Sequence, residues 1–325
     1  MSDLKKLFKK DRLYWIIITV VMLLVVIYLL ANEYGLHHKL FHLENYLEWS
    51  QYLKGVWDAH PELPGQDAFL DEIPSMFLER MVSMTVIVAL IAQAVRLLAQ
   101  ETQNRTEVLR TFPVKSRNLL TCHYLSGLPV VVIPLLVQTV LIRLDVLYVE
   151  KHTDFVFTNK EQLWIYAVKA VIIFMLHYSL LLLCRKIANH VPGTIFTFFV
   201  MEFAIQVMAS YCLHMHWDNL AENSMQNWIF WAIIAAVFVI LSYIADKNKD
   251  YARTGFYAFP IAHWVMMGIV FGEIYFIFYG VFGELYLVFN GVNGDLHKVA
   301  SYLVSVAASL LITGGVHFVT KPKTI

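Results

Sequence analysis

The chain has 325 residues, of which 58% are hydrophobic and 15% charged, and its formal net charge is zero. A soluble domain carries about a quarter charged residues, so this composition and a mean hydropathy of +0.58 exclude an ordinary soluble globular protein. The balanced charge implies no strongly acidic or basic partner, and we expect no binding to nucleic acid.

The N-terminal residues 1–12 mix lysines with apolar residues spaced as on one helix face. This pattern predicts a short amphipathic helix on the inner leaflet, with an ordinary charged flank as the alternative. The uncharged run Leu13–Ala31 follows. It is longer than a signal-peptide core of about 7–15 residues, so we interpret it as a retained first span.

Residues 32–75 form the longest polar stretch after the first span, with eight acidic and two basic residues. The sequence "HHKLFHLENYLEWSQYL" places leucines on one helix face, which predicts an amphipathic helix on the outer membrane surface. Such a helix serves either as a lid over an exit route or as a packed extracellular cap.

Apolar runs of about 20 residues, the length needed to cross a bilayer, recur along the chain. We predict an all-α, polytopic membrane protein of about eight transmembrane helices. The expected spans are Leu13–Ala31, Met76–Ala99, Leu119–Ile142, Leu163–Ile187, Gly193–Met215, Trp228–Ala245, Phe259–Phe282 (extending as far as Phe289) and Val299–Val319.

The lysines and arginines indicate orientation. With the N-terminus inside, the inner segments hold 17 of the 25 basic residues and the outer loops hold six. This asymmetry predicts that both termini are cytoplasmic. We divide the chain into residues 1–12, a six-span core 13–245 and an additional pair of spans 246–325. The alternative is a six-span protein whose last two apolar runs are re-entrant or interfacial.

Among the ionisable residues inside predicted spans, four lie away from the span ends: Lys169, His177, Glu202 and Glu273. Such residues are costly in lipid and usually face protein or water. They mark either a polar patch on a substrate path or hydrogen bonds that fix helix packing. The short turn "NHVPG" places His177 and Glu202 at similar depth, and packing is the favoured role for this pair. We also expect Glu202 to face the bundle interior.

Motifs for covalent or ATP-driven chemistry are absent from the sequence. There is no G-x-x-x-x-G-K-[ST], H-E-x-x-H or G-x-S-x-G, so the chain lacks the P-loop with which it would hydrolyse ATP itself. The three cysteines form no C-x-x-C pair, and the histidines are too few on one membrane face for a di-iron site. We therefore predict no catalytic residue, metal site or bound cofactor.

The segment Ala99–Leu120, "AQETQNRTEVLRTFPVKSRNLL", is a charged stretch on the predicted inner side between spans two and three. We expect a helix that continues from the preceding span until Pro113 stops it, and a new helix capped by Ser116. Val108, Leu109 and Phe112 form a small apolar group on this otherwise polar segment, so we expect a partner to cover them.

The order "TEVLRTFPVKSRNLL" resembles the cytoplasmic coupling segment of bacterial ABC-2 type transporter permeases. Three departures stand out: Arg105 replaces a usual glycine, Lys115 is an extra residue, and His123 replaces a common lysine. The resemblance covers roughly residues 1–245 when its placement between spans is included. The ATPase-coupling residues that it implies are Glu101, Arg105, Thr106, Glu107, Leu109, Phe112, Pro113, Ser116 and Arg117.

The resemblance implies a permease subunit of an ATP-driven ABC transporter in the bacterial cell membrane. Such a chain exports a hydrophobic or amphipathic substrate such as a peptide, lipid or drug. Its expected partners are an ABC ATPase subunit, which holds ATP and Mg, a second permease subunit in a homo- or heterodimer, and membrane lipid. The chain itself is then not an enzyme.

Two other functions remain open from the residues. An intramembrane enzyme acting on lipids or prenyl groups would need acidic or histidine side chains clustered at one depth, whereas this sequence scatters them. A membrane sensor or immunity protein that binds a peptide outside would suit the acidic loop 32–75. ATPase stimulation on reconstitution would separate the permease from both.

Overall fold

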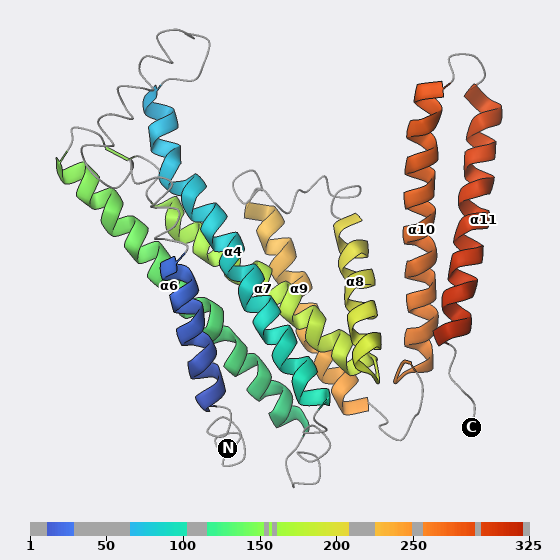
Figure 1. The fold of residues 1–325 in the computed structure, drawn as a ribbon, viewed down its shortest axis with the longest axis horizontal. Coiled ribbons are helices and arrows are strands. Elements are labelled where there is room, and N and C mark those ends of the chain that lie inside the picture. The colour runs from blue at the N-terminus through green and yellow to red at the C-terminus, as the bar shows by residue number, and fades with distance from the viewer. Residues whose placement is uncertain are drawn as a thin grey trace. The chain divides into compact units, whose positions relative to one another are not determined.

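The computed structural model describes residues 12–28, 66–102, 116–152, 156–157, 161–207, 225–248, 256–289 and 294–320. Within these ranges the regular structure is helical, as predicted (Figure 1). The helices are Arg12–Tyr28, α4 (Gln66–Thr102), α6 (Ser116–His152), α7 (Gln162–Ile187), α8 (Val191–Val207), α9 (Met225–Asn248), α10 (Pro260–Phe289) and α11 (Gly294–Thr320).

Six of the described helices, α4, α6, α7, α9, α10 and α11, contain an apolar stretch long enough to cross a membrane. Arg12–Tyr28 and α8 are also apolar but shorter; α8 has 17 residues. The chain therefore has the length and composition of a multi-span membrane protein, and the predicted all-α class is confirmed.

Several helices extend beyond the spans that hydropathy predicts. The helix α4 begins at Gln66, ten residues before the predicted start at Met76, and α6 continues to His152, ten residues past Ile142. A hydropathy average locates the apolar part of a helix, whereas backbone hydrogen bonding continues through polar residues in water. By contrast, the predicted span Leu163–Ile187 agrees with α7 to one residue.

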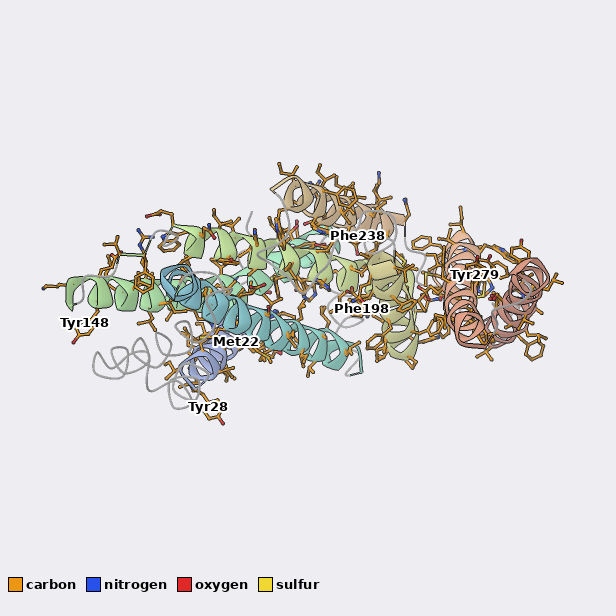
Figure 2. All side chains as sticks on the ribbon, turned by 90° about the horizontal axis from the view of Figure 1, so that it is seen from above. Met22, Tyr28, Tyr148, Phe198, Phe238 and Tyr279 are labelled. Carbon is orange, nitrogen blue, oxygen red and sulfur yellow. The ribbon has the colours of Figure 1, made fainter. Side chains whose placement is uncertain are left out.

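Large apolar side chains point outward along the helices. Tyr28 and Tyr148 project away from the ribbon (Figure 2) and are 63% and 49% exposed. Leu311 and Phe318 on α11 are also exposed. In water such a surface would be unfavourable, but lipid tails are as apolar as leucine and cover it without cost. Tyrosines near helix ends are typical of the membrane–water interface.

The helices divide into two units, each described by itself. Unit 1 comprises residues 1–178 with 220–222 and 228–232. In this unit α4 and α6 pack against each other, and the Gln138 side-chain amide donates to Thr85 Oγ1 at 2.6 Å. Both side chains are fully buried, so a hydrogen bond joins the helices within the apolar interior.

Unit 2 comprises residues 179–219, 223–227 and 233–325. The amide of Asn189 donates to the Phe256 carbonyl at 3.1 Å, and the amide of Ala258 donates to the Ile187 carbonyl at 2.7 Å. These bonds tie the turn after α7 to the segment before α10. Nearby, Lys186 and Asp246 form an ion pair whose side chains are largely buried.

Two predicted elements cannot be followed in the structure. Almost all of the amphipathic N-terminal helix, residues 1–11, lies outside the described residues, and so does the predicted outer helix, residues 37–53. Both stay predictions from the sequence.

Candidate functional site

The predicted coupling segment lies between α4 and α6. Glu101 is the penultimate residue of α4, and Ser116 is the first residue of α6. Arg117 is exposed on the first turn of α6, and its carbonyl accepts a hydrogen bond from Thr121 Oγ1 at 2.9 Å. The remaining predicted coupling residues lie outside the described residues: Arg105, Thr106, Glu107, Leu109, Phe112 and Pro113.

A buried arginine lies close to the end of α4 that leads into this segment. Arg96 is 1% exposed, and its Nη1 donates to Ser126 Oγ at 2.7 Å and to Gln93 Oε1 at 3.4 Å. Its guanidinium carbon lies 4.8 Å from the centre of the Tyr14 ring. We call Arg96, Tyr14, Gln93 and Ser126 the Arg96 node; it joins the helix Arg12–Tyr28, α4 and α6.

The node follows from the chemistry of arginine in an apolar span. A guanidinium stays charged, so its burial is tolerated only where its donors and its face find partners. Ser126 and Gln93 supply oxygen acceptors, and the face of the Tyr14 ring supplies negative potential. A polar side chain from a neighbouring helix thus fixes the position of the arginine, and the arginine in turn fixes the helices.

The hydrogen bonds continue from the node to α7. Ser126 Oγ donates to the His123 carbonyl at 3.2 Å, and the Tyr178 hydroxyl donates to the same carbonyl at 3.0 Å. Gly127 makes this approach possible, because a Cβ there would lie 2.7 Å from Tyr178 Cε1, well inside contact distance. A continuous path of polar contacts therefore links α4, α6 and α7.

The α4–α6 pair has a consistent antiparallel register. Thr85 contacts Gln138 and Arg96 contacts Ser126. Residue numbers therefore rise along α4 as they fall along the facing part of α6. The two contacts are 11 residues apart on α4, about 16 Å along a helix axis. The segment 103–115 therefore joins two helices whose separation is fixed at two depths.

The predicted intramembrane residues lie in different surroundings. The Lys169 amine, half-buried, lies 5.5 Å from the Tyr166 ring centre and 5.3 Å from that of Trp228, a cation–π arrangement. His177 Nδ1 is 2.8 Å from the Ile173 carbonyl in its own helix. These contacts are local to unit 1 and fit a role in packing.

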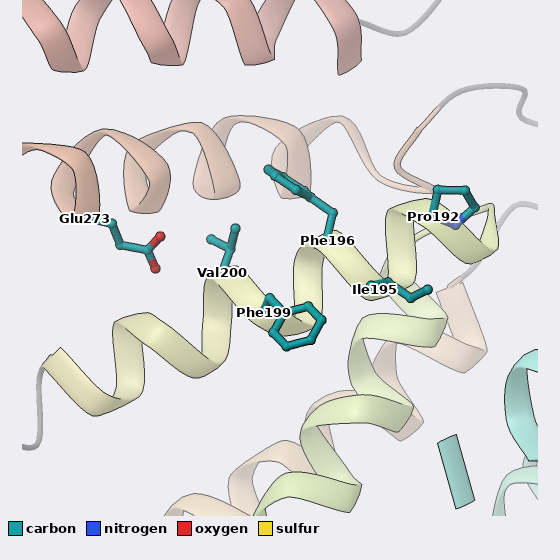
Figure 3. Close-up of a pocket in the computed structure, with 6 residues that line it drawn as sticks. All are labelled: Pro192, Ile195, Phe196, Phe199, Val200 and Glu273. Carbon is teal, nitrogen blue, oxygen red and sulfur yellow. The ribbon is translucent and has the colours of Figure 1, made fainter. Parts of the chain in front are cut away.

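Glu202 and Glu273 belong to unit 2 and differ in their partners. Glu202 accepts a 3.4 Å hydrogen bond from Gln206 on the same helix, and the predicted interior orientation of Glu202 remains a prediction. Glu273 lies on the edge of a groove between α8 and α10 (Figure 3). Its Oε1 is buried and has no hydrogen-bond partner in the part of the chain that the structure describes.

The groove has a volume of about 620 Å³. Apart from Glu273 its lining is apolar and comes from one face of α8: Pro192, Ile195, Phe196, Phe199 and Val200. Phe196 also packs edge-to-face on Phe256. Gly193 lies close to the same ring, since a Cβ at this position would lie 3.3 Å from Phe256 Cε1. The segment before α10 therefore supports the groove wall.

Sequence reasoning did not identify the Arg96 node or the Lys186–Asp246 pair. Arg96 was counted only as an inner positive charge at the end of a span. A signal did exist, because "AQAVRLLAQ" carries the arginine within an apolar helical run, and an arginine there needs an acceptor. Among the described residues no group of three or more histidine, cysteine, aspartate or glutamate side chains could hold a metal ion.

Compared with known proteins, the chain matches no protein-family model, no curated protein and no solved structure. The resemblance to ABC-2 permeases therefore depends on the residues of the coupling segment and its setting between helices.

Proposed function

We propose that the chain is the permease subunit of an ATP-driven ABC transporter that exports a hydrophobic or amphipathic substrate. The observation that carries the proposal is the charged segment between α4 and α6, whose residues resemble an ABC-2 coupling segment. A separate ATPase subunit, which binds ATP and Mg, would dock there, and a second permease subunit would complete the pathway.

The Arg96 node supplies a route for coupling. ATP binding would move the ATPase subunits and with them the segment 103–115. Arg96 lies six residues before the end of α4 at Thr102 and contacts Ser126 on α6 and Tyr14 on the first helix. A displacement of the segment would therefore move these helices together rather than bend each one separately, which is what transmission to the spans requires.

The experiment removes the predicted apolar anchor of the docking segment. Leu109→Ala with Phe112→Ala should release the ATPase subunit during purification, because truncating a buried interface anchor costs about 2 kcal/mol or more. Glu107→Ala, a charge at the rim, should weaken binding less. Co-purification of the ATPase is the measurement, alongside the amount of the permease in the membrane.

A matched control makes the same kind of substitution, a large apolar residue to alanine, at another position of the chain. Leu144→Ala with Leu147→Ala removes two exposed leucines at the other end of α6 and should leave the ATPase bound. Full retention of ATPase and transport activity by the Leu109/Phe112 variant would show that the segment is only a turn, and the permease proposal would lose its main support.

The proposal includes eight spans with both termini in the cytoplasm of a bacterial cell, so that Arg12–Tyr28 and α8 also cross. Single cysteines test this topology after Cys122, Cys184 and Cys212 are replaced. Glu222→Cys should react with a membrane-impermeant maleimide in intact cells, and Lys249→Cys should react only after permeabilisation. Equal labelling at both positions would rule out the eight-span arrangement.

A further inference from the structure

The groove between α8 and α10 combines an apolar wall with one carboxyl group. Phe196, Phe199 and Ile195 are among the apolar residues that line it, and Phe199 is 65% exposed. The volume of about 620 Å³ lies in the range of small-molecule sites, about 300–1,000 Å³. In shape and lining the groove suits an elongated apolar ligand.

The carboxyl group of Glu273 is what distinguishes this groove from ordinary lipid-facing surface. Its side chain extends from α10 toward Val200 on α8 (Figure 3), and its Oε1 is buried without a hydrogen-bond partner among the described residues. A buried polar oxygen without a partner is unfavourable, and in lipid the cost is larger for a charged one. A ligand that donates a hydrogen bond and carries positive charge would relieve both costs.

No lysine or arginine among the described residues forms an ion pair with Glu273. Segment 208–224, which follows α8, contains neither lysine nor arginine, and neither does 290–293, which follows α10. The basic residues of α7 and α9 near this unit include Lys186, whose partner is Asp246. A bound molecule that carries positive charge would therefore be the charge complement of Glu273.

The position of Glu273 along α10 limits which cationic molecules can reach it. Glu273 follows Pro260, the first residue of α10, by 13 residues, about 20 Å along a helix axis. The amine of an ordinary phospholipid headgroup stays at the membrane surface, outside a hydrocarbon core of about 30 Å. A cation that reaches Glu273 must belong to a molecule that enters the core.

We propose that the α8–α10 groove binds a cationic amphiphile, with its protonated amine against Glu273 and its apolar body along the α8 face. As a statement about the exported substrate class, this inference rests on the proposed permease function. The binding site itself does not require that function. An ammonium–carboxylate hydrogen bond is a strong contact in a medium of low dielectric constant, and the Phe196 and Phe199 rings add apolar contact area to the site.

The test measures binding to the full-length chain in phosphatidylcholine nanodiscs, without ATPase. The probe is octadecylammonium carrying a photoactivatable diazirine, and the matched neutral probe is the corresponding octadecanol. The ammonium probe should bind at least about tenfold more tightly, because its hydrogen bond to the carboxyl group is assisted by charge and that of the alcohol is not. Its cross-links should map to 191–207 and to α10 near Glu273.

Variants assign the preference to one carboxyl group. Glu273→Gln should abolish the tenfold preference for ammonium, whereas Glu273→Asp, which keeps the charge, should retain part of it. Glu202→Gln is the matched control, since Glu202 is on α8 but does not line the groove, and should leave the preference intact. An unchanged preference in Glu273→Gln would overturn the proposal.

Two further arms keep the test decisive if Glu273→Gln is poorly folded. Cross-links of the wild-type protein that map away from α8 and α10 would overturn the proposal on their own. Phosphatidylethanolamine in the nanodiscs should not compete with the probe, and competition would assign the groove to a lipid headgroup. A Phe199→Cys variant that forms disulfide-linked dimers and loses labelling would assign it to a second copy of the chain.

The binding result and the permease function fail separately. If the ATPase does not dock at 103–115 but the ammonium preference persists, the permease proposal is wrong and the binding site stands. If the ATPase docks normally and the ammonium preference is absent, the permease proposal stands and the substrate class is wrong.

Discussion

The hairpins α4–α6 and α10–α11 hold their helices together by different means. Between α4 and α6, buried side chains form hydrogen bonds at two depths, Gln138 to Thr85 and Arg96 to Ser126. The helices α10 and α11 run side by side over their length (Figure 1). Their described polar contacts, His263 with His317 and His263 with Thr320, lie at one end.

Among the described side chains, aromatic rings also join α10 to α11. Toward the other end Tyr275 packs edge-to-face on Tyr302 at 5.9 Å. The described glycines of this hairpin do not set its close approach, since a Cβ at Gly268 or Gly314 would meet nothing within 4 Å. Gly127 of α6 is the opposite case, because Tyr178 fills the space beside it.

The difference shows that helices in the same lipid bilayer can pair in two ways. Lipid provides no hydrophobic drive between helices, so packing and hydrogen bonds hold them together. Hydrogen bonds at fixed positions determine the register of α4 against α6, whereas aromatic surfaces allow small sliding movements. We therefore expect substitutions at polar contacts to affect the α4–α6 hairpin more strongly than α10–α11.

The largest effect is expected at the Arg96 node. Arg96→Met removes the hydrogen bonds to Ser126 and Gln93 and leaves their oxygens without that donor, with a partly filled cavity beside Tyr14. We expect a loss of about 3 kcal/mol in the free energy of unfolding. Reversible unfolding in mixed detergent micelles measures it.

The control for this substitution is Arg117→Met on the same hairpin. Arg117 is exposed, so its replacement should change the free energy of unfolding by about 0.5 kcal/mol or less. Equal losses at positions 96 and 117 would show that the node does not stabilise the hairpin.

A smaller effect is expected at the second polar contact. Thr85→Val alone leaves the buried Gln138 amide without its acceptor and should cost about 1 kcal/mol. Gln138→Leu added to it removes the unpaired amide, including Gln138 Oε1, which has no partner among the described residues. The double variant should therefore recover most of the loss, and a double-mutant cycle of unfolding free energies measures the coupling. Additive losses would contradict the direct contact.

The sequence predicted the class of fold well because hydropathy reports directly on lipid contact. The start of α7 and the short turn to α8 were both placed within two residues. The last ten residues of α6 were missed because Arg143, Asp145 and Glu150 end the apolar run while the helix continues. In this part of α6 the two Nη atoms of Arg143 donate to the two carboxylate oxygens of Glu161, at 2.7 and 3.3 Å. A hydropathy average cannot predict such an ion pair.

The candidate site was predicted less completely, since side-chain partners depend on helix rotation. The sequence gives Arg96 and Ser126 as separate residues 30 positions apart, and only the antiparallel register of α4 and α6 brings them together. Glu273 was identified as an intramembrane charge, but its groove depends on which face of α8 meets α10. Periodicity could not show this, because α8 is apolar on nearly all sides.

The smallest effect is expected at the His263–His317 contact. Thr320 Oγ1 donates to the Val316 carbonyl at 2.7 Å, so it accepts from His263 Nδ1 at 3.4 Å. A neutral His263 then accepts at Nε2, and the proton in the 2.8 Å contact belongs to His317 Nδ1. Tyr257 lies beside His263 and supplies no counter-charge, because burial raises the pKa of its hydroxyl above the ordinary value.

His317→Phe keeps an aromatic ring against Trp264 and removes this donor. Hydrogen bonds between helices in a bilayer contribute about 0.6 kcal/mol on average, and the His317 side chain is half-buried. We expect a loss near that value, well below the loss for Arg96→Met in the same unfolding assay. His317→Asn, whose amide is also a donor, should recover part of it. A loss of about 3 kcal/mol for His317→Phe would mean that the α10–α11 hairpin depends on its polar contact as strongly as α4–α6 does.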